Sequence, residues 1–340
     1  MSRAGRGSAI VGWGQAVPDT IVTNDDLSEV LDTSDAWIRE RTGIGERRVL
    51  WGRFGPRAGT STAVGPLTAT APLGTTATLA VDAGRAALAS AGLGPLDIDL
   101  LVLCTSTPDQ TVPATSASVA AALGLRCGAF DLNTACSGFV YGLLTADAFV
   151  GFGMDRVLLI GAESCSRITD WDDRATAILF GDGAGAIVLE AVLGRGGLQG
   201  ADFGTDGSLQ SILFADVCGT FQMEGKEVFR RAVRAVVQSA RSALSAAGAE
   251  AADVDVFVAH QANARIIEAV CARLSLPLER AVSILEHTGN TSAASIPMAL
   301  ATAVTTGRLA DGDLLLISGF GAGMAWGSIA WRWGRPAPLA

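Results

Sequence analysis

Three short segments of the chain carry side chains that could act together on a carbonyl group. Cys136 lies within Asn133–Phe139, His260 directly follows an apolar run, and Asn290 lies in a stretch of small residues. A thiolate is a nucleophile, and imidazole and amide N–H groups donate hydrogen bonds to a developing oxyanion. The chain has 2 histidines, His260 and His287, so any role for an imidazole falls to one of them. This set of side chains is suited to thioester chemistry.

Cys136 is predicted to lie at the start of a helix. The strand-like run Ala129–Leu132 is followed by a turn and then by a helical pattern over Gly138–Val150. Unpaired N–H groups and the positive end of the helix dipole would stabilise a thiolate there, and also an oxyanion. The small residues around Cys136 leave room for a substrate, which favours a nucleophile over a buried structural cysteine. The structural reading is the default for the others: Cys104, Cys127, Cys165, Cys218 and Cys271.

His260 and Asn290 are predicted to lie where strands and helices meet. His260 ends a buried strand at Val254–Ala259, and sites in α/β folds form at the carboxyl ends of strands. The alternative is a histidine that caps the next helix. For Asn290, which precedes a helix start, the alternative is an ordinary N-cap. His287 is expected to support the site at most.

An internal repeat indicates which elements position these side chains. Ala87–Gly92 and then Asp97–Val102 recur 156 positions later as Ala243–Gly248 and Asp253–Val258. Both copies have the pattern of a helix end, a glycine stop, a short loop and a buried strand. The first copy leads to Cys104 and the second to His260.

Two further matches support an internal duplication. Asn133–Ser137 matches His287–Thr291 at a spacing of 154, which aligns Cys136 with Asn290, and Gly181–Ile187 matches Gly319–Ala325. We expect an α/β protein in two halves, residues 1–190 and 191–340, with helices covering mostly parallel sheets. Pairing the halves around a pseudo-twofold axis would bring Cys136 and Asn290 face to face, with His260 nearby.

The bulk composition narrows the class of protein. The chain has 340 residues, 49% of them hydrophobic, and a net charge of −9, so it has a large core and is a poor match for nucleic acid. Its 6 cysteines show no metal-ligand spacing, and no membrane span is expected. A cytoplasmic protein with free thiols is the consistent expectation. Leu50–Thr75, rich in Gly, Pro, Thr and Ala, is predicted to be a surface loop, with a substrate lid as the alternative.

Motifs along nearly the whole chain point to one family. They are Asp32–Ile38, Arg41–Ile44, Asn133–Phe139, Phe180–Ala186, His260–Asn263, Gly289–Ser295 and Phe320–Gly327. Together they resemble the β-ketoacyl-acyl-carrier-protein synthase III family of the thiolase superfamily. The resemblance implies a duplicated five-layer α-β-α-β-α fold, a homodimer and a Cys-His-Asn triad. It implies acyl-CoA and an acyl carrier protein as partners, with no metal and no cofactor beyond coenzyme A thioesters as substrates.

The resemblance also implies a role for each site residue. Cys136 would take an acyl group, and backbone N–H groups of Cys136, Ala322 and Gly323, in the Gly321–Gly323 turn, would form its oxyanion hole. His260 and Asn290 would stabilise the enolate formed from a malonyl thioester. The residues implied to bind coenzyme A and pantetheine are Thr33, Trp37, Arg41, Arg174 and Asn263. Those implied to meet the carrier protein are Arg230 and Arg265, whose alternative is solvated surface.

Val112 separates this chain from the acetyl-using members that it resembles, which carry a larger phenylalanine at the pocket floor. A smaller residue would admit a longer or branched acyl group, so we expect starter-unit priming in specialised metabolism. Val112→Phe should then shift preference toward acetyl-CoA. One alternative is acyl transfer from Cys136 to an alcohol or amine, with His260 as general base. Another is a non-catalytic partner subunit, which would lack a nucleophile.

Overall fold

Two mixed β-sheets form the framework of the protein. The computed structural model describes residues 5–51 and 75–334. The first sheet has the order β1-β7-β6-β4-β5 and the second the order β11-β12-β13-β8. The strands of the first sheet are β1 (Arg6–Ala16), β4 (Leu100–Cys104), β5 (Gly128–Leu132), β6 (Arg156–Ser164) and β7 (Asp182–Leu193). Those of the second are β8 (Leu198–Thr205), β11 (Val256–Ala259), β12 (Leu314–Gly321) and β13 (Ala325–Arg332).

The sheets are less parallel than the sequence predicts. β4 runs parallel to β5 and β6, and β11 runs parallel to β12, whereas β1, β7, β13 and β8 pair antiparallel. Ala322–Met324 alone joins β12 to β13, and so short a connection permits only an antiparallel pair. The expectation of mostly parallel sheets is therefore wrong.

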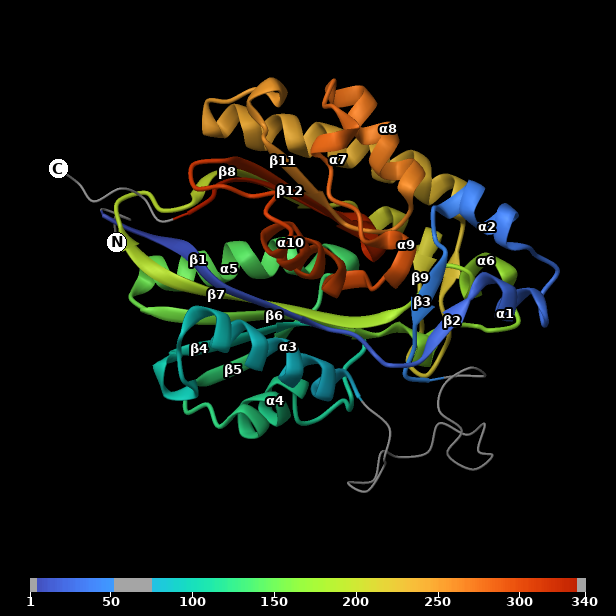
Figure 1. The fold of residues 1–340 in the computed structure, drawn as a ribbon, viewed down its shortest axis with the longest axis horizontal. Helices are drawn as coiled ribbons and strands as arrows, with labels where there is room; N and C mark the ends of the chain where they lie inside the picture. The colour runs from blue at the N-terminus through green and yellow to red at the C-terminus, as the bar shows by residue number, and fades with distance from the viewer. Residues whose placement is uncertain (1–4, 52–74, 335–340) are drawn as a thin grey trace.

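Helices cover both sheets and fill the space between them, which gives five layers (Figure 1). The outer layers are α3 (Thr76–Ala91) with α4 (Thr115–Leu123) below, and α7 (Gly225–Ala247) with α8 (Ala264–Leu274) above. The middle layer holds α5 (Gly138–Phe152) and α10 (Ser295–Thr305). In α7, buried residues such as Val228, Ala232 and Val236 recur at a helical spacing, which places one apolar face on the second sheet.

The central helix α5 is buried between two layers rather than exposed on one face. By length and composition alone, Ala135–Phe152 could cross a membrane. Here Phe139, Val140 and Leu143 are fully buried and belong to the core that unites both sheets. Its all-round apolar character is therefore that of a core helix.

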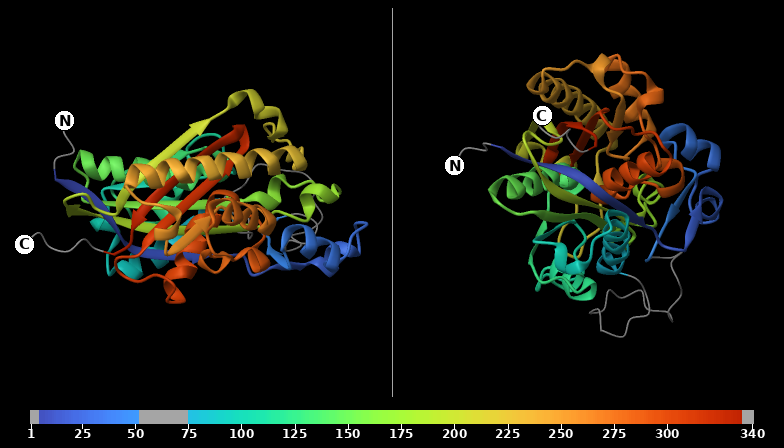
Figure 2. Two further views of the ribbon diagram at one scale, coloured as in Figure 1. Left: turned by 90° about the horizontal axis from the view of Figure 1, so that it is seen from above. Right: turned by 60° about the vertical axis from the view of Figure 1, so that its left-hand side comes forward.

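Smaller elements lie at one end of the layers. Both views in Figure 2 show this for the blue helices of residues 24–42. The smaller elements are β2 (Ile21–Thr23), α1 (Asn24–Ser28), α2 (Asp35–Thr42), β3 (Glu46–Arg48), α6 (Arg174–Ala177), β9 (Leu213–Phe214), β10 (Gln222–Met223) and α9 (Leu285–Thr288). Single-turn 3₁₀ segments link several of the elements. The loop predicted at Leu50–Thr75 lies almost wholly outside the described residues.

The first predicted repeat is visible in the structure at its predicted spacing. α3 ends before Gly92 (φ 68°) and α7 ends before Gly248 (φ 70°), both in the left-handed region that favours glycine. A short 3₁₀ turn and a buried strand follow in each copy. A parallel bridge between Phe257 and Ala281 stands where the first sheet has β5. The predicted boundary at residue 190 falls inside β7; as a division into domains it stays a prediction.

The second match has a different register from the predicted one. The Asn133 Oδ1 accepts the Ala135 N–H at 3.0 Å, and the Asn290 Oδ1 accepts the Ser292 N–H at 2.8 Å. Ala135 and Ser292 also share a φ of 47°. Asn290 therefore corresponds to Asn133, at a spacing of 157, and not to Cys136.

The third match is displaced as well. Gly319 lies inside β12, whereas Gly181 precedes β7. β6 pairs with β7 as β12 pairs with β13. At the turn end of each pair, Asp182 lies opposite Ser164 in the first sheet, and Ala325 lies opposite Gly321 in the second. Asp182 therefore corresponds to Ala325. The predicted duplication holds, but residue identity misaligned both matches because these turns are built from similar small residues.

Candidate active site

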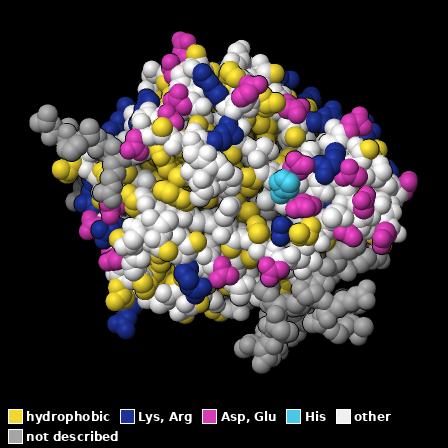
Figure 3. Space-filling model, in the orientation of Figure 1, with side chains coloured by type: hydrophobic (Ala, Val, Ile, Leu, Met, Phe, Trp, Pro, Cys, Tyr) yellow, Lys and Arg dark blue, Asp and Glu magenta, His cyan; other side chains and the backbone are white. Residues whose placement is uncertain are grey.

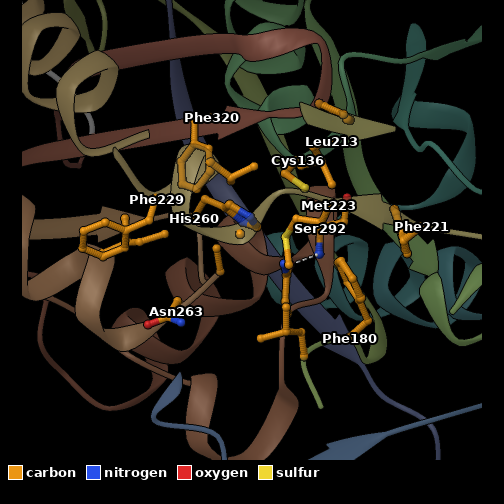
Figure 4. A pocket seen from close by; sticks show the side chains of 18 of the residues that line it. Cys136, Phe180, Leu213, Phe221, Met223, Phe229, His260, Asn263, Ser292 and Phe320 are labelled. Atoms are coloured by element: carbon orange, nitrogen blue, oxygen red, sulfur yellow. Dashed lines mark hydrogen bonds between the residues drawn. The ribbon is translucent and has the colours of Figure 1, made fainter. Parts of the chain in front are cut away.

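A cavity of about 1180 Å³ opens between the two halves and brings together the three predicted catalytic residues. Cys136, His260 and Asn290 all line it. Figure 4 shows the Cys136, His260 and Ser292 side chains gathered at its centre, with Phe320 beside His260. The three side chains that the sequence predicts to meet thus line one cavity, and their roles stay predictions.

Cys136 lies at the start of α5, as predicted. It forms part of the 3₁₀ turn Ala135–Ser137 that leads into the helix. The end of β12 approaches this turn so closely that a Cβ on Gly321 would lie 2.7 Å from the Cys136 nitrogen. Only glycine permits this approach, which brings the turn after β12 next to the thiol.

The Cys136 thiol is neutral, so the helix terminus that the sequence predicts to stabilise a thiolate does not suffice to form one. Burial raises the pKa of the thiol to about 12, and the nearby Glu163 carboxylate adds to the rise. The Ser292 hydroxyl opposes this rise in pKa. The helix N-terminus therefore does not outweigh desolvation, and activation of the thiol requires a proton acceptor.

His260 is a buried, neutral imidazole at the end of β11. Its Nδ1 lies 2.7 Å from the Ser295 Oγ, and this hydroxyl accepts the backbone N–H of Gln261 at 3.2 Å. We assign the hydroxyl hydrogen to the contact with Nδ1, which leaves the ring proton on Nε2. Burial lowers the pKa of His260 to about 3. The ring therefore offers the cavity an N–H donor.

Asn290 is held so that its amide N–H₂ group is free to donate. Its Oδ1 is occupied by the Ser292 N–H, and its backbone pairs with Leu179 and Gly181. A Cβ on Gly181 would lie 2.2 Å from the Thr288 carbonyl oxygen, so the glycine-rich segment after Phe180 is needed for this contact. The N-cap alternative is set aside, because the Asn290 side chain binds a turn that precedes α10 and not the first turn of that helix.

Ala322 and Gly323, the predicted oxyanion-hole residues, also line the cavity. They form the turn between β12 and β13, in which Gly323 has a φ of 72°. This left-handed conformation is accessible to glycine at low cost. The turn and the Cys136 backbone lie on adjacent segments, as the predicted oxyanion hole requires.

Sequence reasoning missed three residues of the site. Ser292 and Ser295 orient Asn290 and His260, and Glu163 lies behind Cys136. Both serines belong to the run of small residues after Asn290. Ser295 contacts His260 through its hydroxyl, whereas Ser292 binds Asn290 through its backbone N–H and Glu163 through its hydroxyl. Glu163, within an apolar strand, was the one charged residue of that strand's carboxyl end.

The predicted coenzyme A residues divide into two groups. Trp37, Arg41 and Asn263 line the cavity, whereas Thr33 and Arg174 do not. The guanidinium carbons of Arg41 and Arg174 nevertheless lie 4.3 and 4.8 Å from the centre of the Trp37 ring. The ring is thus an aromatic platform with two cations over it.

Asn263 is occupied within the protein. Its Nδ2 donates to the Arg41 carbonyl at 2.9 Å, and its Oδ1 caps α8 by accepting the Arg265 N–H at 2.9 Å. A pantetheine that contacts Asn263 must therefore share its Nδ2 or Oδ1 with these protein partners. The Thr33 Oγ1 is buried without a hydrogen-bond partner among the described residues, and so retains its capacity to bind a ligand.

The comparisons with known proteins agree with this site. The model of 3-oxoacyl-[acyl-carrier-protein (ACP)] synthase III matches residues 130–207, and the model of its C-terminal part matches residues 244–333. A β-ketoacyl-[acyl-carrier-protein] synthase III 2 of Streptomyces coelicolor is 46% identical over 346 residues, which cover 99% of this chain and 98% of the relative. The chain belongs to the 3-oxoacyl-[acyl-carrier-protein] synthase III family.

Solved structures of the synthase III family share the architecture of this chain. The enzyme from Aquifex aeolicus superposes with a TM-score of 0.88 at 39% identity, covering 96% of this chain and 100% of that one. The priming β-ketosynthase of the R1128 polyketide biosynthetic pathway superposes with a TM-score of 0.87 at 34% identity, covering 99% of each chain. The predicted thiolase-like five-layer fold is confirmed.

Val112 does not line the cavity of its own chain, and its role at the pocket floor stays a prediction. Its side chain is 82% exposed and is absent from the residues that line the cavity. Within one chain, Val112 therefore does not form the pocket floor, because the loop that carries it turns outward after β4. Aromatic and aliphatic side chains from other segments provide the apolar lining: Phe180, Leu213, Phe214, Phe221, Met223 and Phe229.

The two predicted carrier-protein residues have different surroundings. Arg265 lines the cavity together with Lys226, the only lysine of the chain. Arg230 does not line it, and its exposed side chain pairs with Glu227 at 2.7 Å. Basic and acidic side chains alternate over the layer of α7 and α8 (Figure 3). The cationic rim is therefore formed by Lys226 and Arg265 rather than by Arg230.

Proposed function

We propose that this protein transfers an acyl group from coenzyme A to Cys136 and condenses it with a malonyl thioester on an acyl carrier protein. The observation that carries the proposal is a cavity in which Cys136 meets two neutral N–H donors, His260 Nε2 and Asn290 Nδ2. Relatives that are named β-ketoacyl-[acyl-carrier-protein] synthase III and match nearly the whole chain support it.

The first half-reaction loads the enzyme. The Cys136 sulfur attacks the thioester carbonyl, and the negative charge develops on the carbonyl oxygen. Backbone N–H groups of Cys136 and of the turn at Ala322 and Gly323 are the donors for this oxyanion. Coenzyme A leaves, and the acyl group remains on Cys136. The chain itself supplies the chemistry, and coenzyme A thioesters enter as substrates rather than as a resident cofactor.

The second half-reaction uses the two side-chain donors. The malonyl thioester loses carbon dioxide, and negative charge moves onto its carbonyl oxygen as the enolate forms. His260 and Asn290 donate to this oxygen in a buried site, where a preorganised donor lowers the barrier by about 3–4 kcal/mol. The resulting carbanion attacks the acyl-Cys136 carbonyl and expels the Cys136 thiolate, which takes up a proton from solvent to restore the neutral thiol.

The starter acyl group is proposed to be larger than acetyl, in a priming step of specialised metabolism. The support is the apolar part of the cavity, where the Phe180 and Phe221 rings stack with centroids 4.1 Å apart, and the likeness to a polyketide priming ketosynthase. This support replaces the argument from Val112.

Transfer to an alcohol or amine without decarboxylation fits the geometry less well. That reaction would use His260 as a general base, but the basic nitrogen of its ring faces Ser295 and the other carries hydrogen. A non-catalytic subunit has no need of the nucleophile, which this chain retains in an accessible cavity.

A homodimer in the cytoplasm is part of the proposal. β5 pairs only with β4 within the described residues, and its residues are exposed or half-buried, unlike those of β4. An unpaired strand edge of this kind invites a second chain. All 6 cysteines are unpaired, as expected in a reducing compartment.

The test is intact-protein mass after incubation with a panel of acyl-CoA thioesters. Wild type should gain the mass of one acyl group, and Cys136→Ala should gain none. Addition of malonyl-acyl-carrier protein should then discharge the acyl group with release of carbon dioxide. Discharge by alcohols or amines without carbon dioxide would instead favour acyl transfer, and an adduct on Cys136→Ala would refute the assignment of the nucleophile.

A further inference from the structure

A carboxylate that the proposed chemistry does not use lies directly behind Cys136. Glu163, near the end of β6, is fully buried. It accepts hydrogen bonds from the Ser106 N–H and Oγ and, at 2.5 Å, from the Thr107 Oγ1. None of its described hydrogen-bond partners is a cation. Burial of an ionised carboxylate without a countercharge costs free energy, and hydrogen-bond donors offset that cost.

Ser292 connects this carboxylate to the thiol. Its Oγ donates to the Glu163 Oε1 at 3.0 Å, and its hydroxyl is near enough to Cys136 to lower the pKa of the thiol. While Glu163 is ionised the hydroxyl hydrogen is directed to the carboxylate, and the hydroxyl oxygen keeps a lone pair with which it could accept the thiol proton. Figure 4 shows Ser292 facing the same centre as Cys136. The hydroxyl thus lies between the thiol and the carboxylate, and it is hydrogen-bonded to the carboxylate.

The other candidate for a proton acceptor is poorly placed. His260 Nδ1, the basic nitrogen of the ring, is engaged by Ser295, and Nε2 carries the hydrogen that the site presents. We propose that Glu163 accepts the Cys136 thiol proton through the Ser292 hydroxyl during acyl loading, which makes Glu163 a positioning residue for the proposed function. Burial raises the pKa of the Glu163 carboxyl, in keeping with a group that can hold a proton.

The relay balances without a further reactant. The S–H bond of Cys136 breaks as Ser292 takes its proton and passes its own hydrogen to the Glu163 Oε1. The sulfur forms a bond to the thioester carbonyl carbon, and the bond from that carbon to the coenzyme A sulfur then breaks. The electron pair leaves on the coenzyme A sulfur, which receives the proton back from Glu163 through Ser292. Coenzyme A departs as a thiol, and the carboxylate is restored.

A spectator carboxylate would have the opposite effect. A negative charge near a thiol disfavours the thiolate, so its removal from a spectator position should speed acyl loading. Removal of a proton acceptor should slow loading by roughly 100-fold or more. The sign of the change in Glu163→Gln therefore separates the two roles.

The experiment measures acyl loading and condensation separately in the full-length protein. Rapid-quench intact mass follows acyl-Cys136 formation from the acyl-CoA that wild type prefers. Glu163→Gln and Ser292→Ala should each slow loading by roughly 100-fold, and the double variant should be no slower than either, since both belong to one relay. Both variants, once loaded by long incubation, should condense with malonyl-acyl-carrier protein within a few-fold of wild type, because condensation does not require the thiol to lose a proton.

The pH profile supplies an independent readout. Loading by wild type should fall as acidification protonates the carboxylate, whereas the slow loading by Glu163→Gln should lack this limb. Ser292→Ala keeps the carboxylate and tests the relay even if Glu163→Gln folds poorly. The other titratable groups around this end of the sheet are Cys104, Cys136, Cys165, Asp131, Arg167 and Asp182.

Asp182→Asn is the matched control. It removes another fully buried carboxylate from the same sheet, one that binds Ser166 and the backbone of Leu50 instead of Ser292. Its loading rate should stay near that of wild type. Loading by Glu163→Gln that equals or exceeds wild type would overturn the relay, as would an equal loss in loading and condensation. Failure of wild type to load any acyl-CoA would overturn the proposed function itself.

Discussion

At the residue scale, a neighbouring serine sets the orientation of each side-chain hydrogen-bond donor of the site. Ser295 determines which nitrogen of His260 bears hydrogen, and Ser292 determines which atom of Asn290 faces the cavity. Ser295 acts through its hydroxyl and Ser292 through its backbone N–H. Both contacts leave the N–H donors of His260 and Asn290 available to a substrate. A triad in this fold is therefore defined by side-chain orientation as much as by residue type.

Trp37 offers a second test at this scale. Trp37→Ala removes the platform over which Arg41 and Arg174 lie. If the ring stacks on the adenine, about 1–3 kcal/mol of binding is lost, so KM for acyl-CoA should rise roughly tenfold or more. Steady-state kinetics measures this. A short thioester of the same acyl group on N-acetylcysteamine, which lacks the nucleotide, is the control, and its KM should not change. An equal rise for both thioesters would refute nucleotide stacking.

At the element scale, the site depends on how closely strand ends approach helix starts. The end of β12 lies against the turn before α5, and the segment after Phe180 lies against the turn before α10. Each approach is possible because a glycine stands where a side chain would collide. The glycine-rich motifs thus serve backbone packing around the site rather than the binding of a nucleotide phosphate.

Gly321→Ala tests this at its tightest point. A Cβ there would lie 2.7 Å from the Cys136 nitrogen and 3.0 Å from the Ser137 nitrogen. Relief of the overlap should cost about 1–3 kcal/mol in the free energy of unfolding and should displace the oxyanion turn, so acyl loading should fall. Urea unfolding and rapid-quench mass measure the two effects. Gly207→Ala, which adds a Cβ with no atom within 4 Å, should alter neither, and full loading by Gly321→Ala would contradict the argument.

At the scale of the whole molecule, duplication creates a cavity that neither half forms alone. The first half contributes Cys136, and the second contributes His260 and Asn290. The equivalence of Asn133 with Asn290 shows that the two halves retain the same turn but use it differently. The turn that begins at Asn133 is followed by the Cys136 thiol, whereas the turn that begins at Asn290 contributes the amide of Asn290 itself.

The free energy of unfolding should depend on pH through the buried carboxyl of Asp182. Burial raises the pKa of Asp182 from its ordinary value of 3.8 to about 6, so between these values the folded state binds more protons than the unfolded chain. The contribution of this group to the free energy of unfolding should therefore fall by up to about 3 kcal/mol as pH rises through the window. Relative to wild type, Asp182→Asn should gain that amount.

Urea unfolding of both proteins at a series of pH values measures the difference. Carboxylates whose pKa is lowered, such as Asp26 and Asp35, titrate in the opposite sense but are common to both proteins and cancel. A difference that is independent of pH would show that Asp182 keeps its ordinary pKa.

The sequence alone determined which residues meet in the site. Cys136, His260 and Asn290 were identifiable because their local motifs specify strand ends and helix starts, and because the repeat at a spacing of 156 fixes equivalent strands. Such patterns can be interpreted from the sequence alone, because periodicity and glycine stops depend on only a few neighbouring residues.

Only the tertiary structure decided the protonation states and the register. Cys136 is a neutral thiol because packing of both halves removes it from water, an effect that outweighs the local helix terminus. Glu163 joins the site through Ser292, 129 positions away in sequence. Val112 faces outward and the matched turns are shifted in register, because side-chain direction and pairing depend on contacts between distant segments. Desolvation and long-range contacts are properties of the assembled fold, which no local pattern encodes.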